Sequence, residues 1–287
     1  MGTVNNMKTK SGFRNQEGKK EILDLYDSFI EQWKFPHDEQ VVETRFGKTH
    51  LITAGDKDCQ PLILLHGTGM NSAMWLEEIK SYAKEYRVYA PDIPGEPGKS
   101  DERQQSLKGK AYALWFSDVL ESLQIEKVTL IGISLGAWLA LKFSIHYPEC
   151  VEKLVLIAPS GISPAKKSFL FTALYYGFFG EKGTEKLYIK INGGRKLPER
   201  MLVLQKMIKK GFHYRMEEIP IFRDDEIKRL SMPVALFVGG KDIMLPSYKT
   251  ADRLRKLLPH SQINVLPREG HSITRLSAEI MAFLKGD

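Results

Sequence analysis

The chain has 287 residues, of which 43% are hydrophobic, and carries a formal net charge of +7. This length and composition fit one large domain, or two modest ones, with a substantial core. The basic residues are scattered and are not interleaved with aromatic residues in a nucleic-acid motif, so the charge is interpreted as solvated surface and no nucleic-acid partner is expected.

The two cysteines and the apolar runs bear on the compartment. Cys59 and Cys150 lack metal-ligand spacing and are too few for a secreted disulfide framework, so we expect free thiols in a reducing environment. The N-terminal residues contain no apolar signal segment, and the longest apolar stretch, residues 169–179, is too short to span a bilayer. The sequence therefore predicts a cytoplasmic protein with no membrane span.

In chain order, the first segments are a tail, a helix and a hairpin. Residues 1–18 are polar and aperiodic, which is typical of a mobile tail. Apolar residues recur at helical spacing over residues 19–33. Two alternating stretches, residues 41–46 and 48–54, flank Gly47 and predict a β-hairpin. We therefore assign residues 1–40 to an N-terminal tail and helix.

The rest of the chain alternates between short apolar runs and helical patterns. Continuous apolar runs are typical of strands buried on both faces of a parallel sheet. These runs are residues 61–65, 86–90, 127–132, 151–158, 234–238 and 262–266. Helical patterns separate them at residues 74–86, 109–123, 137–147, 248–258 and 273–285. Such alternation predicts an α/β fold with a parallel sheet and helices on both faces, here formed by residues 41–161 and 229–287.

Residues 162–228 interrupt this alternation. The segment is rich in Phe, Tyr and Lys and has helical patterns at 167–179, 183–191 and 198–210. It leaves from the carboxyl end of one strand, which is the edge where open α/β sheets bind ligands. We therefore expect a helical cap placed as a lid. Its aromatic residues have two open interpretations, since they could line an apolar pocket or pack the cap onto the core.

A strand that turns sharply into a helix presents one serine. The sequence there is Gly132-Ile133-Ser134-Leu135-Gly136. The two glycines allow close approach to neighbouring backbone, and the serine is expected in a strained conformation with its hydroxyl exposed at the sheet edge. The following helix N-terminus favours negative charge there. Alone, this pattern also fits a glycine-rich turn with a solvated serine.

Two further residues turn the serine into a candidate nucleophile. Asp242 and His271 each follow a predicted strand, so all three side chains are expected on the same edge of the sheet. A serine hydroxyl needs an adjacent base, and a carboxylate behind the imidazole fixes its tautomer. Each partner has a rival: His66 also follows a buried strand, and Asp92 ends another one. We favour a structural role for His66 and a turn-fixing role for Asp92.

The same reasoning predicts the groups around the substrate. The backbone N–H of Leu135 is expected to donate to the oxyanion of the tetrahedral intermediate, with a second donor from the loop after residues 61–65. We choose Thr68 for that donor, with Gly69 as the alternative. Substrate contacts are expected from Gly67, Gly69, Met70 and Trp138, and no metal ligand is predicted.

Five motifs in this order resemble those of the α/β-hydrolase fold family, over residues 41–284. They are His66-Gly67-Thr68-Gly69, Asp92-Ile93-Pro94-Gly95 with Gly98-Lys99-Ser100, the serine elbow, Gly240-Lys241-Asp242, and Gly270-His271. The resemblance implies an eight-stranded, mostly parallel sheet with a helical cap between strands six and seven. It also implies no metal and no organic cofactor. The chain looks most similar to bacterial carboxylesterases, and a serine rather than an aspartate nucleophile argues against dehalogenases and epoxide hydrolases.

The sequence thus predicts a serine hydrolase that cleaves a small or medium carboxylic ester through an acyl-enzyme intermediate. The partner is a small-molecule ester or acyl substrate, and the protein is expected as a monomer or homodimer. Two other readings stay open. The same triad could hydrolyse a thioester or a carbon–carbon bond in a diketone, or act as a perhydrolase. The fold could also serve a non-catalytic ligand sensor or signalling protein.

Overall fold

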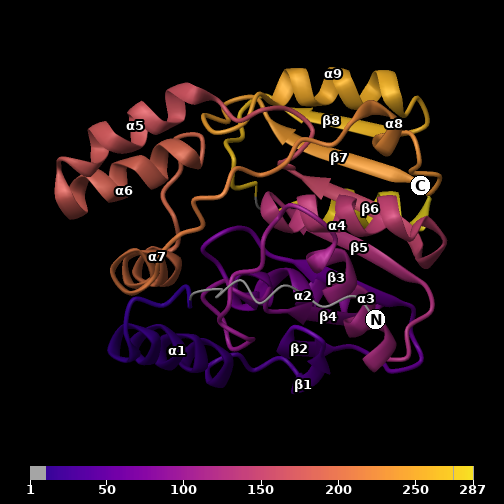
Figure 1. Ribbon diagram of the computed structural model, residues 1–287, viewed down its shortest axis with the longest axis horizontal. Coiled ribbons are helices and arrows are strands. Elements are labelled where there is room, and N and C mark those ends of the chain that lie inside the picture. Colours follow the sequence, from indigo (N-terminus) through magenta and orange to yellow (C-terminus); the bar gives the residue numbers. More distant parts are fainter. Residues whose placement is uncertain (1–10, 274, 287) are drawn as a thin grey trace.

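The computed structural model describes residues 11–273 and 275–286. Within them, eight strands form one sheet in the order β1-β2-β4-β3-β5-β6-β7-β8 (Figure 1). β1 pairs with β2 and β2 with β4 in antiparallel fashion, and the other neighbours are parallel. The mostly parallel eight-stranded sheet that the resemblance implied is therefore confirmed.

The strands coincide with the predicted apolar runs and hairpin to within a few residues. Their bounds are β1 (Asp38–Thr44), β2 (Gly47–Ala54), β3 (Pro61–Leu65), β4 (Arg87–Pro91), β5 (Val128–Ile133), β6 (Val151–Ile157), β7 (Val234–Gly239) and β8 (Gln262–Leu266). The apolar runs predict these strands well because a strand buried on both faces needs apolar side chains at nearly every position.

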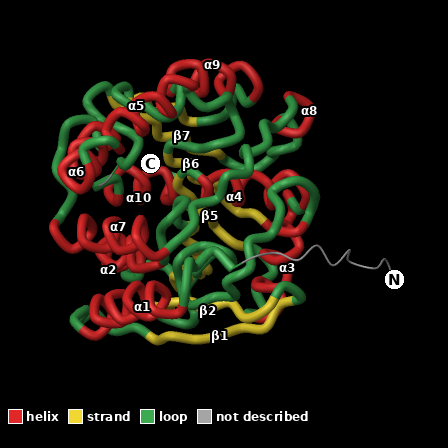
Figure 2. The backbone as a smooth tube through the Cα atoms, turned by 60° about the vertical axis from the view of Figure 1, so that its left-hand side comes forward, coloured by secondary structure: helices red, strands yellow, loops and turns green. Residues whose placement is uncertain are grey.

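Helices cover both faces of the sheet (Figure 2). Alternate strand residues separate into two cores, so that Ile63 packs with α3, α4 and α9, whereas Leu62 packs with α1, α2 and α10. This division follows from the period of two along a strand. The bounds are α1 (Gln16–Glu31), η1 (Ser72–Trp75), α2 (Leu76–Tyr82), α3 (Ala111–Ser122), α4 (Leu135–His146), η2 (Pro148–Cys150), α9 (Ser247–Leu257) and α10 (Ser277–Lys285).

Four more helices intervene between β6 and β7 in the described chain. They are α5 (Lys167–Gly177), α6 (Gly180–Ile191), α7 (Glu199–Gly211) and α8 (Asp224–Ile227). We refer to residues 162–228 as the inserted segment, and to α5 with α6 as the α5–α6 hairpin. The three longer helices match the predicted patterns. No helix in the described residues combines the length and the apolar character needed to cross a membrane.

The prediction of a mobile tail is wrong for residues 11–18, while residues 1–10 lie outside the described residues. Phe13 is buried, and its ring meets that of Phe212 edge to face at 5.4 Å between centroids. The N–H of Arg14 donates to the carbonyl of Gly211 (2.9 Å). These contacts attach the N-terminal segment to the end of α7, and Figures 1 and 2 show α1 alongside α7. The polar composition conceals one apolar anchor, which is why the sequence pattern misleads.

Gly18 explains how closely α1 approaches α7. A Cβ at Gly18 would lie 2.9 Å from the Cα of Gly211. Since such a distance is too short for a carbon–carbon contact, a side chain here would push the helices apart. The N-terminal helix thus supports the inserted segment as well as the sheet.

Candidate active site

Ser134 is the single residue between the end of β5 and the start of α4. Its φ of 54° and ψ of −110° lie outside the regions that L-residues favour, so the turn is strained. A Cβ at Gly132 would lie 2.5 Å from the carbonyl oxygen of Gly136, and one at Gly136 would lie 2.1 Å from that of Leu65. The turn therefore requires both glycines, as the sequence predicted.

The structure brings Ser134, His271 and Asp242 together from three loops. The Nε2 atom of His271 lies 3.0 Å from the Ser134 hydroxyl oxygen, and its Nδ1 atom lies 2.8 Å from Oδ2 of Asp242. A carboxylate only accepts hydrogen bonds, so Nδ1 carries the proton and Nε2 is free to accept from the serine. This is the geometry of a nucleophile, its base and a group that orients the base.

The environment of Asp242 keeps its carboxylate ionised. Burial alone would raise the pKa of Asp242, but the hydrogen bond and charge of His271 lower it below its ordinary value. The other carboxylate oxygen accepts the backbone N–H groups of Met244 (2.6 Å) and Leu245 (2.9 Å), which also lower the pKa. The negative charge is thus fixed beside Nδ1 of the imidazole.

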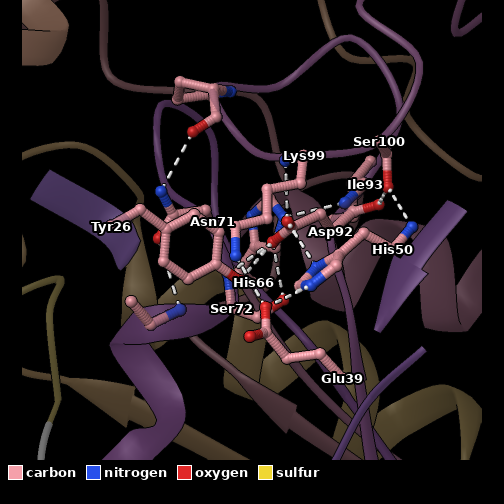
Figure 3. A network of polar contacts seen from close by, with 12 residues as sticks. Tyr26, Glu39, His50, His66, Asn71, Ser72, Asp92, Ile93, Lys99 and Ser100 are labelled. Carbon is pink, nitrogen blue, oxygen red and sulfur yellow. Dashed lines mark hydrogen bonds and ion pairs between the residues drawn. The ribbon is translucent and has the colours of Figure 1, made fainter. Parts of the chain in front are cut away.

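The rival carboxylate, Asp92, belongs to a separate buried network (Figure 3). It accepts hydrogen bonds from the N–H and hydroxyl of Ser72 (2.8 and 2.7 Å), the N–H of Lys99 (2.8 Å) and the hydroxyl of Tyr26 (3.2 Å). Burial opposes its charge, but the hydrogen bond from His50 holds the pKa of Asp92 well below its usual range. Asp92 therefore fixes the turns after β3 and β4, and it does not orient His271.

The rival histidine, His66, has both ring nitrogens occupied. Its Nε2 accepts the N–H of Ile93 (2.9 Å), which leaves Nδ1 to donate to the carbonyl of Gly67 (2.9 Å). Burial lowers the pKa of His66, which favours the neutral ring that these two bonds require. His66 therefore supports the loop that follows β3, in agreement with the structural role predicted for it.

That loop lies against the nucleophile. A Cβ at Gly67 would be only 3.6 Å from the Cβ of Ser134. The N–H of Gly69 donates to Oε2 of Glu96 (2.7 Å), so it is already engaged and is a poor candidate for the oxyanion donor. This observation favours Thr68 over Gly69. The donor roles of Thr68 and Leu135 remain predictions.

Glu96 is a residue of the site that sequence reasoning missed. Its carboxylate is fully buried under the loop after β3, and Oε1 lies 3.8 Å from Nε of Arg215 in the inserted segment. Burial raises the pKa of Glu96 to about 7, against the lowering effects of the Gly69 N–H and the Arg215 charge. The signal in the sequence was weak, because an acidic residue in a Pro-Gly turn is ordinarily a solvated one.

The inserted segment is hydrogen-bonded to the loops that carry Asp242 and His271. At the start of α5, the N–H of Lys166 donates to the carbonyl of Met244 (2.8 Å) and its ammonium to the carbonyl of Asp242 (2.5 Å). At the end of α6, the carbonyl of Ile191 accepts the N–H of His271 (2.7 Å). Both ends of the α5–α6 hairpin are therefore joined to the backbone that carries the candidate base and its carboxylate.

Three of the predicted substrate-binding residues touch the inserted segment. Gln205 on α7 donates to the carbonyl of Gly69 (3.3 Å) and contacts the sulfur of Met70. Trp138 is fully buried, and its indole N–H donates to the carbonyl of Pro220 (2.9 Å). Trp138 thus holds the chain that returns from the inserted segment. Substrate contact by these residues and by Gly67 stays a prediction.

The aromatic side chains of the inserted segment do not all behave as expected. Phe171, Tyr175, Phe178 and Phe179 are exposed, so the proposed role of packing onto the core is wrong for these four, while lining a pocket stays a prediction. Phe169 and Tyr176 are half-buried. The sequence of an apolar helix does not show whether its outer face is covered by other parts of the protein. The exposure of these four side chains was therefore not predictable.

A hollow of about 490 Å³ lies between the α5–α6 hairpin and the loop after β7. Its lining residues are Tyr176, Lys186, Ile189, Lys190, Gly193, Gly194, Lys241 and Ile243. Since the triad residues are not among them, we do not assign this hollow to the acyl group of a substrate.

Comparison with known proteins adds to this geometry. Residues 60–190 match the model of a family described as alpha/beta hydrolase fold. Carboxylesterase YbfK of Bacillus subtilis is 32% identical over 96% of this chain and 97% of its own. The crystal structure of that carboxylesterase, CesB (YbfK), superposes with a TM-score of 0.82 at 30% identity, covering 94% of this chain and 99% of the other. The crystal structure of naproxen esterase from Bacillus subtilis gives 0.84 at 25% identity, with the same coverage.

Proposed function

Since the chain belongs to the alpha/beta hydrolase fold family, we propose that it is a serine hydrolase that cleaves a small or medium carboxylic ester through an acyl-enzyme intermediate. The observation that carries the proposal is the continuous contact from Ser134 through His271 to Asp242, at 3.0 and 2.8 Å. The carboxylesterase names of its relatives support the choice of ester over other acyl substrates.

In the proposed acylation, the hydroxyl oxygen of Ser134 attacks the ester carbonyl while Nε2 of His271 takes its proton. Asp242 stabilises the imidazolium that results. The negative charge on the carbonyl oxygen is held by the N–H groups of Thr68 and Leu135, and losing one such donor typically costs about 3 kcal/mol. His271 then gives its proton to the leaving alcohol, which leaves the acyl group on Ser134.

Deacylation uses the same groups in reverse order. A water molecule replaces the alcohol, and Nε2 of His271 removes its proton as it attacks the acyl-enzyme. The second tetrahedral intermediate collapses with proton return to Ser134, which releases the carboxylic acid. The strained backbone at Ser134 supports both steps because it keeps the hydroxyl projecting from the turn towards His271.

The test is covalent labelling followed by kinetics. A fluorophosphonate probe should label Ser134 in the parent protein, with the labelled peptide identified by mass spectrometry, and should not label Ser134→Ala. Ser160→Ala serves as a control, since Ser160 is a serine in the loop that follows the neighbouring strand β6. Labelling of the Ser134→Ala protein at the parent rate, with thermal unfolding unchanged, would rule out Ser134 as the nucleophile.

A substrate panel then separates ester hydrolysis from the other reactions that the same triad allows. We expect p-nitrophenyl acetate and butyrate to turn over faster than the matching thioesters and faster than a diketone with a scissile carbon–carbon bond. Faster cleavage of the diketone would reassign the reaction. Probe labelling without turnover of any of these substrates would instead favour a ligand sensor.

A further inference from the structure

The outer face of α5 is exposed and apolar. Among the described residues, eleven large apolar side chains are exposed, and six of them fall within residues 170–179, each between 56% and 87% exposed. They are Leu170, Phe171, Leu174, Tyr175, Phe178 and Phe179. Contiguous apolar patches of this kind are rare on soluble monomers and mark interaction surfaces.

Helical spacing explains why these side chains share a face. Residues 170, 171, 174, 175 and 178 are separated by one, three or four positions, so they form one stripe along the helix. The opposite stripe contains Phe169, Ala173 and Tyr176, which are half-buried. Helix α5 is therefore apolar on both faces, although the described residues cover only one of them.

The α5–α6 hairpin is also basic. Residues 166–190 contain five lysines and two glutamates, which gives a net charge of +3. One of the two glutamates, Glu181, forms an ion pair with Lys206 of α7 (3.7 Å). Lys182 and Lys186 are exposed on α6. An apolar stripe accompanied by lysines has the chemistry of a helix that lies in the interface of an anionic bilayer.

We propose that the α5–α6 hairpin docks on an anionic lipid surface, with the outer stripe of α5 inserted among the lipids and the lysines against the headgroups. Figure 1 shows the hairpin at one side of the molecule, away from the helices that cover the sheet. The exposed aromatic and aliphatic side chains extend over about two helical turns and can enter the boundary between headgroups and acyl chains. The lysines add attraction to the phosphate groups.

The positive charge of the hairpin favours an anionic lipid surface over a second copy of the chain as the binding partner. A dimer built on the same stripe would bring together two copies of residues 166–190, each with a net charge of +3, and like charges in proximity oppose association. An anionic lipid surface instead neutralises them. The hydrogen bonds from Lys166 to the Asp242 loop and from His271 to Ile191 hold the docked hairpin against the loops that carry the candidate base and its carboxylate.

The test measures binding without turnover, so it is independent of whether the protein hydrolyses esters. The parent protein is sedimented with vesicles of phosphatidylglycerol and phosphatidylcholine in roughly equal parts, and with vesicles of phosphatidylcholine alone. The doubly substituted Phe171→Ser/Phe178→Ser protein is compared with Val41→Ser/Tyr248→Ser, whose side chains are also exposed but lie outside the hairpin. Thermal unfolding checks that each variant is folded.

We expect the parent and the control to bind the anionic vesicles, and the hairpin variant to bind at least about tenfold more weakly. Binding should also fall at about 0.5 M NaCl and on phosphatidylcholine alone. Equal binding by the two folded variants would overturn the proposal. So would the absence of vesicle binding together with a parent dimer that the hairpin variant abolishes, because the stripe would then be a protein interface.

Discussion

Glu96 offers a direct measurement of how burial acts at this site. Its carboxylate accepts the N–H of Gly69 (2.7 Å) and lies 3.8 Å from Nε of Arg215. The substitution Glu96→Gln keeps the shape and an acceptor for the Gly69 N–H. It removes the titration of the carboxyl group, so a comparison across pH isolates that titration.

The magnitude follows from the pKa. Burial raises the pKa of Glu96 from an ordinary value of 4.5 to about 7, and each unit corresponds to about 1.4 kcal/mol, which gives about 3 kcal/mol. The folded protein holds the proton more tightly than the unfolded chain. This contribution to the free energy of unfolding is therefore fully present below pH 4.5 and is lost as the pH rises through about 7.

The assay is urea unfolding of the parent and of Glu96→Gln at about pH 5, 6, 7 and 8. The difference in the free energy of unfolding, parent minus variant, should fall by about 2 to 3 kcal/mol from pH 5 to pH 8. Other titrating groups are shared by both proteins and cancel. Glu77→Gln, whose carboxylate is exposed on α2, controls for the loss of one negative charge. A difference that stays constant across this range would refute the reasoning.

Three further substitutions test separate parts of the site. Gly136→Ala places a Cβ 2.1 Å from the Leu65 carbonyl, so we expect a loss of about 3 kcal/mol in urea unfolding, whereas an unchanged stability would contradict the close approach. Asp242→Asn should lower kcat by about 10⁴-fold with little change in KM, because the wrong imidazole tautomer is favoured; a tenfold or smaller loss in steady-state assays would contradict its role. Trp138→Phe removes the indole N–H that donates to the carbonyl of Pro220, so the free energy of unfolding should fall by about 1 kcal/mol in thermal unfolding. An unchanged free energy of unfolding would contradict a stabilising role for that hydrogen bond.

The sheet and the triad were predictable because both depend on local patterns. A strand buried on both faces leaves a continuous apolar run, as at residues 61–65, and the turn at Ser134 requires the glycines that flank it. Convergence of Asp242 and His271 then follows from the topology, since the loops after parallel strands share one edge. Strand order alone places Asp242 and His271 at one edge, and the structure brings their side chains to 2.8 Å.

The features that escaped prediction depend on what lies across from a residue. Glu96 is unusual only because Gly69 and Arg215, distant in the chain, bury it. Phe13 belongs to a polar segment and is anchored only because Phe212 is there to receive it. The exposed stripe of α5 is the reverse case, an apolar helix face that the described residues leave open to solvent. The spacing of residues in the sequence does not distinguish these three cases, because each depends on contacts between residues that are distant in the chain.

The anchoring of the inserted segment restricts how it could move without disturbing the site. If the end of α6 moves, the hydrogen bond between the Ile191 carbonyl and the His271 N–H must break, or His271 must move with the helix. If the start of α5 moves, the hydrogen bond from Lys166 to the Asp242 carbonyl must break, or Asp242 must move as well. Helix α7 approaches α1 closely at Gly18 and is also joined to α6, through the hydrogen bond from Lys209 to Thr184 and the ion pair of Lys206 with Glu181. A rigid outward swing would therefore move the imidazole and the carboxylate as well. Since Glu181 and Thr184 lie at the start of α6, next to the hairpin tip, their contacts with α7 restrain the tip as well.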